Sequence, residues 1–157
     1  MNISKYITKE QALQKAKQFC AYQERCHSET KEKLYSFGLH KNDVEELLAQ
    51  LIEENFLNEE RYAIAFAGGH FRTKQWGRIK IKYALSQKKV SAYCIKKALA
   101  NIDEDDYEHT LTKLATARLA TLKSEKNIFV KKNRLQNYLL QKGYEGSLIS
   151  SIIKTIV

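Results

Sequence analysis

The chain has 157 residues and a formal net charge of +9, with 43% hydrophobic and 29% charged residues, which is the balance of a folded domain and excludes a disordered chain. It contains no proline and six glycines, and because proline is the residue that α-helices tolerate least, the composition predicts helix almost throughout. The excess of positive charge favours a polyanionic partner, either nucleic acid or an acidic protein surface.

No stretch of the sequence is long and apolar enough for a membrane span, and Met1–Tyr6 lacks the apolar run of a signal peptide. We therefore expect a cytoplasmic protein that does not bind a membrane. The three cysteines, Cys20, Cys26 and Cys94, are odd in number and lack the spacing of zinc ligands. Free, buried or half-buried thiols are the expectation, with no metal.

The first three predicted helices cover 9–26, 28–37 and 41–54. Gly38 follows the second of them, at a position where a left-handed C-terminal cap would end the helix. The next three are predicted at 58–73, 76–88 and 91–101, and the last three at 104–125, 128–142 and 145–156. Four residues at or near predicted helix starts can accept hydrogen bonds from exposed N–H groups: they are Ser28, Asn58, Ser91 and Asp103.

A repeat is visible when the chain is aligned on Gly38, Lys89 and Gly143, each at the end of a second helix. The residues six, ten and thirteen positions further on are apolar in every copy and share one helix face. They are Val44, Ile95 and Ile149, then Leu48, Leu99 and Ile153, then Leu51, Ile102 and Ile156. Lys89 replaces a glycine, so we expect its helix to end without a left-handed cap.

This pattern predicts an all-α protein of three tandem three-helix repeats, at 1–56, 57–102 and 103–157. Because small repeats bury little apolar surface alone, we expect them to pack end to end in an elongated, curved array. A single compact globule of nine helices is the alternative.

Charge is segregated along the chain. From Asn42 to Glu60 there are seven acidic residues and no Lys or Arg, whereas from Ala67 to Asn101 there are nine basic residues and no Asp or Glu. Such a stretch can contact phosphate oxygens without repulsion from carboxylates. The alternative is an ordinary solvated surface, or a basic stretch that pairs with the acidic one.

The candidate binding residues are the basic side chains on the second helices and just before the middle one. The first set is Arg72, Lys74, Arg78, Lys80 and Lys82, and the second is Lys31, Lys33, Lys131, Lys132 and Arg134. We expect that reversing the charge of Arg78 and Lys82 abolishes function and leaves the fold intact. Trp76 could stack on a base, but its usual burial favours a place in the core.

Catalytic motifs are missing from the sequence. It contains no nucleophile elbow, zinc-protease motif or phosphate-binding loop. Gly68-Gly69 lies inside a predicted helix, where small residues favour close helix packing. The protein is therefore expected to bind rather than to catalyse, without a cofactor.

The segment Phe56-Leu57-Asn58-Glu59-Glu60-Arg61-Tyr62-Ala63, followed by Phe66, then Phe71-Arg72 and Trp76-Gly77-Arg78-Ile79-Lys80, resembles the RecX family. The resemblance covers roughly residues 9–156 and is strongest from 56 to 90. Asn58-Glu59 stands in place of a common Asp-Asp pair, and the first helix of the third repeat matches poorly.

The resemblance implies a monomeric regulator that lies in the groove of the RecA–single-stranded DNA filament. Its partners would be RecA and single-stranded DNA, with duplex DNA as a further possibility. It would inhibit recombinase and coprotease activity, and so modulate DNA repair and the SOS response. Two alternatives stay open. One is a helix-turn-helix regulator that prefers certain duplex sequences, and the other is a helical-repeat scaffold that binds only protein.

Overall fold

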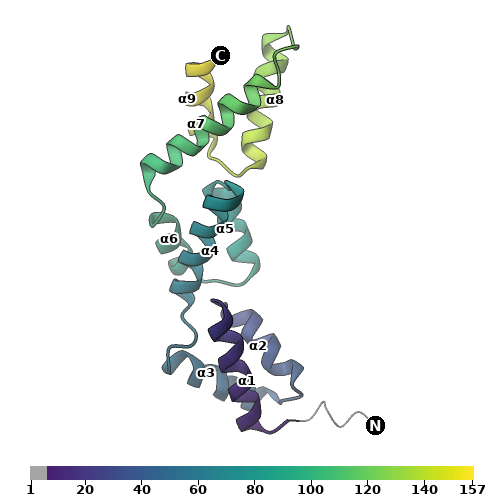
Figure 1. Cartoon of the computed structure of the whole chain (residues 1–157), viewed down its shortest axis with the longest axis vertical. Helices are drawn as coiled ribbons and strands as arrows, with labels where there is room; N and C mark the ends of the chain where they lie inside the picture. The colour runs from purple at the N-terminus through teal and green to yellow at the C-terminus, as the bar shows by residue number, and fades with distance from the viewer. Residues whose placement is uncertain (1–6) are drawn as a thin grey trace, which may run out of the picture. The chain divides into compact units, whose positions relative to one another are not determined.

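A computed structural model describes residues 7–157, and within this range the chain forms nine α-helices and no strand (Figure 1). Met1–Tyr6, the segment expected to lack a signal peptide, lies outside the described residues. The helices are α1 Lys9–Tyr22, α2 His27–Ser36, α3 Lys41–Glu53, α4 Glu59–Lys74, α5 Arg78–Gln87, α6 Ala92–Ala100, α7 Glu104–Ala120, α8 Ile128–Gln141 and α9 Gly146–Ile156. The all-α prediction is confirmed, and most bounds differ by one or two residues from those expected.

The two helices predicted too long are α1 and α7. Residues beyond Tyr22 turn toward α2 because Arg25 folds back, and its Nε donates a hydrogen bond of 2.9 Å to the carbonyl of Phe19. At the end of α7, the hydroxyl of Thr121 donates to the carbonyl of Arg118 at 2.6 Å. Side-chain bonds to the last carbonyls of a helix compete with its continuation.

Three of the four predicted caps are confirmed. Asn58, Ser91 and Asp103 accept hydrogen bonds of 2.9, 3.2 and 2.9 Å from backbone N–H groups three residues further on. The prediction for Ser28 is wrong, because α2 begins at His27 and the capping position falls on Cys26. The Ser28 hydroxyl instead donates to the carbonyl of Lys88 at 2.7 Å.

The three repeat anchors share one backbone conformation. Gly38, Lys89 and Gly143 have φ angles of +85°, +62° and +97°, all in the left-handed region. After Lys89, the N–H of Val90 reaches back to the carbonyl of Leu85 at 3.1 Å, as in a glycine-capped helix end. The expectation that this helix ends without a left-handed cap is therefore wrong, because the backbone bonds hold a lysine in that conformation.

Replacing Lys89 by glycine should raise the free energy of unfolding by about 1 kcal/mol. A non-glycine residue pays roughly 1–2 kcal/mol for the left-handed conformation, and the greater freedom of glycine in the unfolded chain offsets part of that gain. Urea unfolding followed by circular dichroism measures the change. Lys96→Gly, inside α6, is the control and should lower the same quantity by about 1 kcal/mol. A loss of stability in Lys89→Gly would contradict the prediction.

The contacts group the described residues into two compact units. One unit comprises the residues up to Ala65 together with Leu85–Lys97, and the other comprises Phe66–Ala84 and Ala98–Val157. The division falls inside α4, α5 and α6, so the three repeat boundaries stay a prediction.

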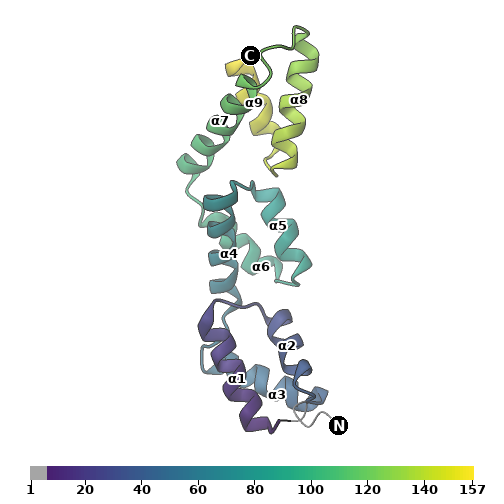
Figure 2. The same ribbon diagram turned by 45° about the vertical axis from the view of Figure 1, so that its right-hand side comes forward.

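In the first unit, α1, α2 and α3 pack against one another (Figures 1 and 2). The centre of this bundle consists of small and aliphatic side chains from all three helices and the segment that follows them: Ala12, Ala16, Cys20, Leu34, Val44, Leu47, Leu51 and Leu57. All three cysteines of the chain are buried and unpaired, which confirms the expectation of free thiols. Burial raises the pKa of the Cys20 thiol.

In the second unit, α7, α8 and α9 form a bundle in which Tyr107 and Tyr144 are fully buried. The two rings lie 5.0 Å apart between centroids, and the Phe71 ring of α4 lies 5.8 Å from that of Tyr107. Across the repeats, the apolar register is confirmed. Val44, Ile95, Ile149, Ile153, Leu51 and Ile102 are buried, and Leu48, Leu99 and Ile156 are half-buried.

Candidate nucleic-acid interface

Most basic side chains of the middle repeat form no ion pair within the described residues. Among the described residues, Arg78 is the only one of the nine basic residues from Ala67 to Asn101 that forms an ion pair. The acidic residues of 42–60 that form ion pairs do so with Lys9, Lys17 and His27 of the first two helices. These ion pairs therefore do not support the alternative in which the acidic residues of 42–60 neutralise the basic residues of 67–101.

Two lysines of this stretch meet at Trp76. Gln75 has a φ of +58°, which turns the chain between the end of α4 and the start of α5. The Nζ atoms of Lys74 and Lys80 lie 5.3 and 4.8 Å from the centroid of the Trp76 ring, and the His70 ring lies 4.6 Å from it. We call these four residues the Trp76 cluster.

Trp76 is half-buried, and it is not among the buried residues of the core. The prediction that it belongs to the core is therefore wrong. The turn at Gln75 places Trp76 beyond the end of α4, where its ring lies near the His70 ring and the ammonium groups of Lys74 and Lys80.

Arg72 and Lys82 are exposed, on the last turn of α4 and in the middle of α5. The guanidinium of Arg72 lies over Gly68, and a Cβ added to Gly68 would be 2.7 Å from its Nη1 atom. A Cβ added to Gly69 would meet nothing within 4 Å. The prediction that this glycine pair allows close helix packing is wrong, because the space at Gly68 is used by an arginine of the same helix.

Arg78 differs from the other candidates. Its Nη1 and Nη2 atoms each bond at 2.6 Å to a carboxylate, of Glu145 and Glu104 respectively. Its guanidinium also lies 3.8 Å from the ring centroid of Tyr107, whose hydroxyl accepts a hydrogen bond of 3.0 Å from the Arg78 backbone N–H and donates to Glu145. Reversing this charge would place three carboxylates together, so the expectation that Arg78 can be reversed without harm to the fold is wrong. A direct binding role for Arg78 stays a prediction.

Sequence reasoning missed Lys142, which adds a cation beside the Trp76 cluster. Its Nζ donates to the carbonyl of Lys74 at 3.2 Å. The contact exists because the end of α8 lies against the start of α5, where the N–H groups of Gly77 and Ile79 donate to the carbonyls of Lys142 and Gly143 at 2.7 and 2.9 Å. No local sequence pattern predicts this contact between the end of α8 and the start of α5, because the two segments are far apart in the chain.

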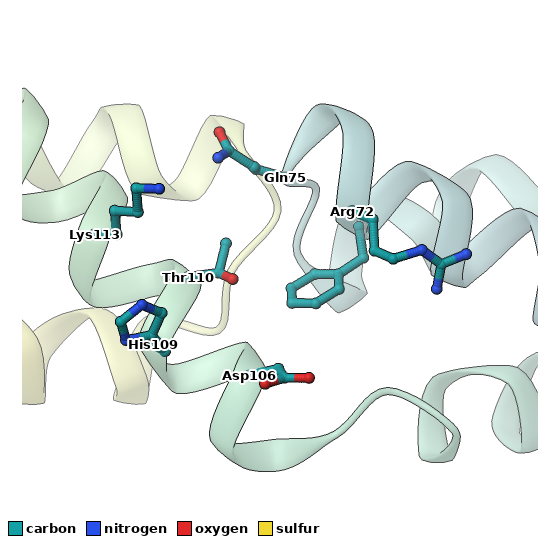
Figure 3. Close-up of a pocket in the computed structure, with 7 residues that line it drawn as sticks. Arg72, Gln75, Asp106, His109, Thr110 and Lys113 are labelled. Atoms are coloured by element: carbon teal, nitrogen blue, oxygen red, sulfur yellow. The ribbon is translucent and has the colours of Figure 1, made fainter.

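A pocket of about 270 Å³ lies between the end of α4 and α7 (Figure 3). It is lined by Phe71, Arg72, Gln75, Asp106, His109, Thr110 and Lys113. The guanidinium of Arg72 points away from it (Figure 3). Lys113 gives the pocket a positive charge, and the carboxylate of Asp106 opposes it.

The second set of candidates is not part of the Trp76 cluster. On α2, Lys31 is half-buried and Lys33 is exposed, and both belong to the first unit. On α8, Lys131 is half-buried, and Lys132 and Arg134 are exposed, with Arg134 3.7 Å from Glu125. These three lie toward the start of α8, on the order of 15 Å along the helix axis from Lys142. Their role as contacts stays a prediction.

Within 7–157, no group of three or more His, Cys, Asp or Glu side chains is placed to hold a metal ion. No helix of that range is long and apolar enough to cross a membrane. What the Trp76 cluster can do is contact anionic groups through ammonium ions and stack a planar ring on an indole.

The described residues form an all-helical protein in which α1–α3 and α7–α9 each pack as a three-helix bundle. The description "RecX, second three-helix domain" matches residues 58–99, and "RecX, third three-helix domain" matches residues 104–153. The chain belongs to the RecX family of regulatory proteins.

Known relatives agree with this membership. The chain is 33% identical over 133 residues to "Regulatory protein RecX" of Clostridium perfringens (strain SM101 / Type A), covering 84% of this chain and 62% of that protein. It is 29% identical over 134 residues to the protein of the same name from Clostridium botulinum (strain Eklund 17B / Type B), covering 85% and 62%. The chain thus spans less than two thirds of the length of these relatives.

Solved structures show the same fold. The crystal structure of RecX from Lactobacillus salivarius matches with a TM-score of 0.85 and 26% identity, over 94% of this chain and 96% of that one. A second crystal structure, of a regulatory protein RecX, matches with a TM-score of 0.84 over 93% of this chain and 71% of the other. Its 21% identity supports the fold alone.

Proposed function

We propose that the protein binds the RecA–single-stranded DNA filament in its groove and inhibits the recombinase and coprotease activities of RecA, thereby modulating DNA repair and the SOS response. The observation that carries the proposal is the set of exposed cations at the end of α4 and on α5, which no carboxylate of the described chain neutralises. Family membership supports a regulatory role, and it supports binding rather than catalysis.

The physical basis is electrostatic. Basic side chains that contact phosphates release the counterions condensed on nucleic acid, which favours binding and makes it depend on salt. Arg72, Lys74 and Lys82 are exposed and free of ion pairs, so they reach such phosphates at little cost. A helical protein that occupies the groove then hinders entry of a duplex and growth of the filament without any chemical step.

The first test measures inhibition of RecA-driven ATP hydrolysis and strand exchange on single-stranded DNA. We expect inhibition below one molecule of this protein per RecA. The double variant Arg72→Glu with Lys82→Glu should raise the half-inhibiting concentration about tenfold or more, and the salt dependence should weaken because two phosphate contacts are lost. Arg78 is left unchanged, because its carboxylate bonds tie it to the fold.

The matched control is Lys15→Glu with Lys41→Glu, which changes the net charge equally at exposed positions of α1 and α3. It should inhibit like the unmodified protein. Equal inhibition by the Arg72 and Lys82 variant, with its fold verified by circular dichroism, would rule out this surface as the contact.

The alternatives predict different results. A helix-turn-helix regulator would bind duplex DNA with sequence preference and would act without RecA. A protein-binding scaffold would show no affinity for nucleic acid even at low salt. Electrophoretic mobility shifts with single-stranded and duplex DNA, with and without RecA, separate the three.

A further inference from the structure

Trp76 is the only tryptophan of the chain, and two lysine ammonium groups lie over its ring. It is half-buried in a turn, and the amines of Lys74 and Lys80 lie over its ring at about 5 Å. An indole that serves only to fill the core is normally surrounded by apolar side chains. Here two flexible lysine side chains lie over the ring.

We propose that Trp76 is a stacking platform for one unpaired base of single-stranded DNA, with Lys74 and Lys80 contacting the phosphates on either side of that base. The inference rests on the proposed function and deepens it, because it assigns the nucleic-acid contact to one aromatic ring. The base would replace the lysines over the indole, and His70, 4.6 Å from the ring, would support the platform from within the cluster.

Stacking is favoured over the resting arrangement for a physical reason. A cation over a half-buried aromatic ring is a modest contact, whereas a base stacked on an aromatic side chain is a favourable contact that tolerates any sequence. Each displaced ammonium group loses its contact with the ring but gains a contact with a phosphate. Duplex DNA cannot use the platform, since its bases are already stacked and paired.

The surface next to the cluster continues the same chemistry. On α5, Ile79 and Tyr83 are 52% and 67% exposed, four residues apart on one helix face, and Lys82 is exposed beside Tyr83. Exposed aromatic and basic side chains in alternation are typical of channels that bind single strands. Tyr83 is therefore a second exposed ring available for stacking.

The sole tryptophan makes a direct test possible. Tryptophan fluorescence of the whole protein is titrated with a thymidine oligomer and with an abasic deoxyribose-phosphate oligomer of equal length. Binding of both is followed in parallel by anisotropy of labelled oligomers. We expect the thymidine oligomer to quench the fluorescence in step with binding, and the abasic oligomer to bind with little quenching.

Variants provide a second measurement. Trp76→Leu should weaken binding of the thymidine oligomer about tenfold and leave binding of the abasic oligomer unchanged, whereas Trp76→Phe should retain most of the affinity. Tyr22→Leu is the control, because Tyr22 is an 83% exposed ring beside Arg25 in a part of the chain that also carries Glu24. It should bind both oligomers normally.

Other outcomes distinguish failure of this inference from failure of the proposed function. Binding of the thymidine oligomer without quenching would show that the ring takes no base, and would leave the proposed function standing. If neither oligomer binds while RecA is still inhibited, the stacking platform is likewise ruled out and the proposed function stands. A fluorescence change with RecA alone would assign Trp76 to a protein contact. Failure of RecA inhibition despite quenching would instead contradict the proposed function and keep the platform.

Discussion

Gly143→Ala is expected to lower the free energy of unfolding by about 3 kcal/mol, because two costs combine. Gly143 has a φ of +97°, and a side chain in the left-handed region costs roughly 1–2 kcal/mol. An added Cβ would also lie 2.3 Å from the Cβ and 2.7 Å from the backbone nitrogen of Lys80, and overpacking typically costs about 1–3 kcal/mol. The clash is with a helix backbone, which cannot rotate away.

Gly77 is the partner in this close approach, and Gly77→Ala should have an effect of similar size. Its Cβ would lie 2.4 Å from the carbonyl carbon and oxygen of Gly143. Separating the two segments would also break the hydrogen bonds that the start of α5 donates to the end of α8, each worth about 1 kcal/mol. Those bonds join the positive end of one helix to the negative end of the other, which is a favourable alignment.

Urea unfolding followed by circular dichroism measures both variants. Gly69→Ala is the matched control, since a Cβ there meets nothing within 4 Å and alanine is the better helix former. It should raise the free energy of unfolding by about 1 kcal/mol. If Gly143→Ala and Gly77→Ala were as stable as the unmodified protein, the α5–α8 junction would not have the geometry described.

The second large effect is expected for Arg78→Met, which should lower the free energy of unfolding by about 3 kcal/mol. Hydrogen bonds to charged groups are worth roughly 1.5–3 kcal/mol each, but the bond to Glu104 counts little because that side chain is 73% exposed. Most of the loss comes from Glu145, 27% exposed, which would keep only the Tyr107 hydroxyl as a donor. Burial raises the pKa of Tyr107, so this hydroxyl remains protonated and able to donate.

The measurement is again urea unfolding, with Lys82→Met as the control for loss of one positive charge on the same helix. Within the part of the chain that the structure describes, Lys82 is exposed and forms no ion pair, so its change should stay within about 0.5 kcal/mol. A double-mutant cycle of Arg78→Met with Glu145→Gln should show coupling, because the two side chains share a bond. Additive effects of the two substitutions would mean that the Arg78–Glu145 pair does not stabilise the protein.

The sequence by itself determined the helices, their order and the repeat. Absence of proline, capping residues such as Asn58 and Asp103, and apolar residues at helical spacing act within a few residues of the chain, so they can be read without a structure. The same holds for the segregated basic stretch and for the family resemblance between Phe56 and Lys80, which the comparisons confirmed.

Only the tertiary structure decided what individual candidate residues do. Arg78 and Lys82 look alike in sequence, but Arg78 meets Glu145 across 67 positions of the chain, and Lys82 meets no carboxylate. Trp76 is half-buried because of a turn at Gln75, and Lys89 is left-handed because of bonds that close behind it. Partners and exposure depend on contacts between distant segments, whereas propensity and spacing are properties of neighbouring residues. Local patterns therefore predict elements, and packing decides which of their side chains remain free to bind.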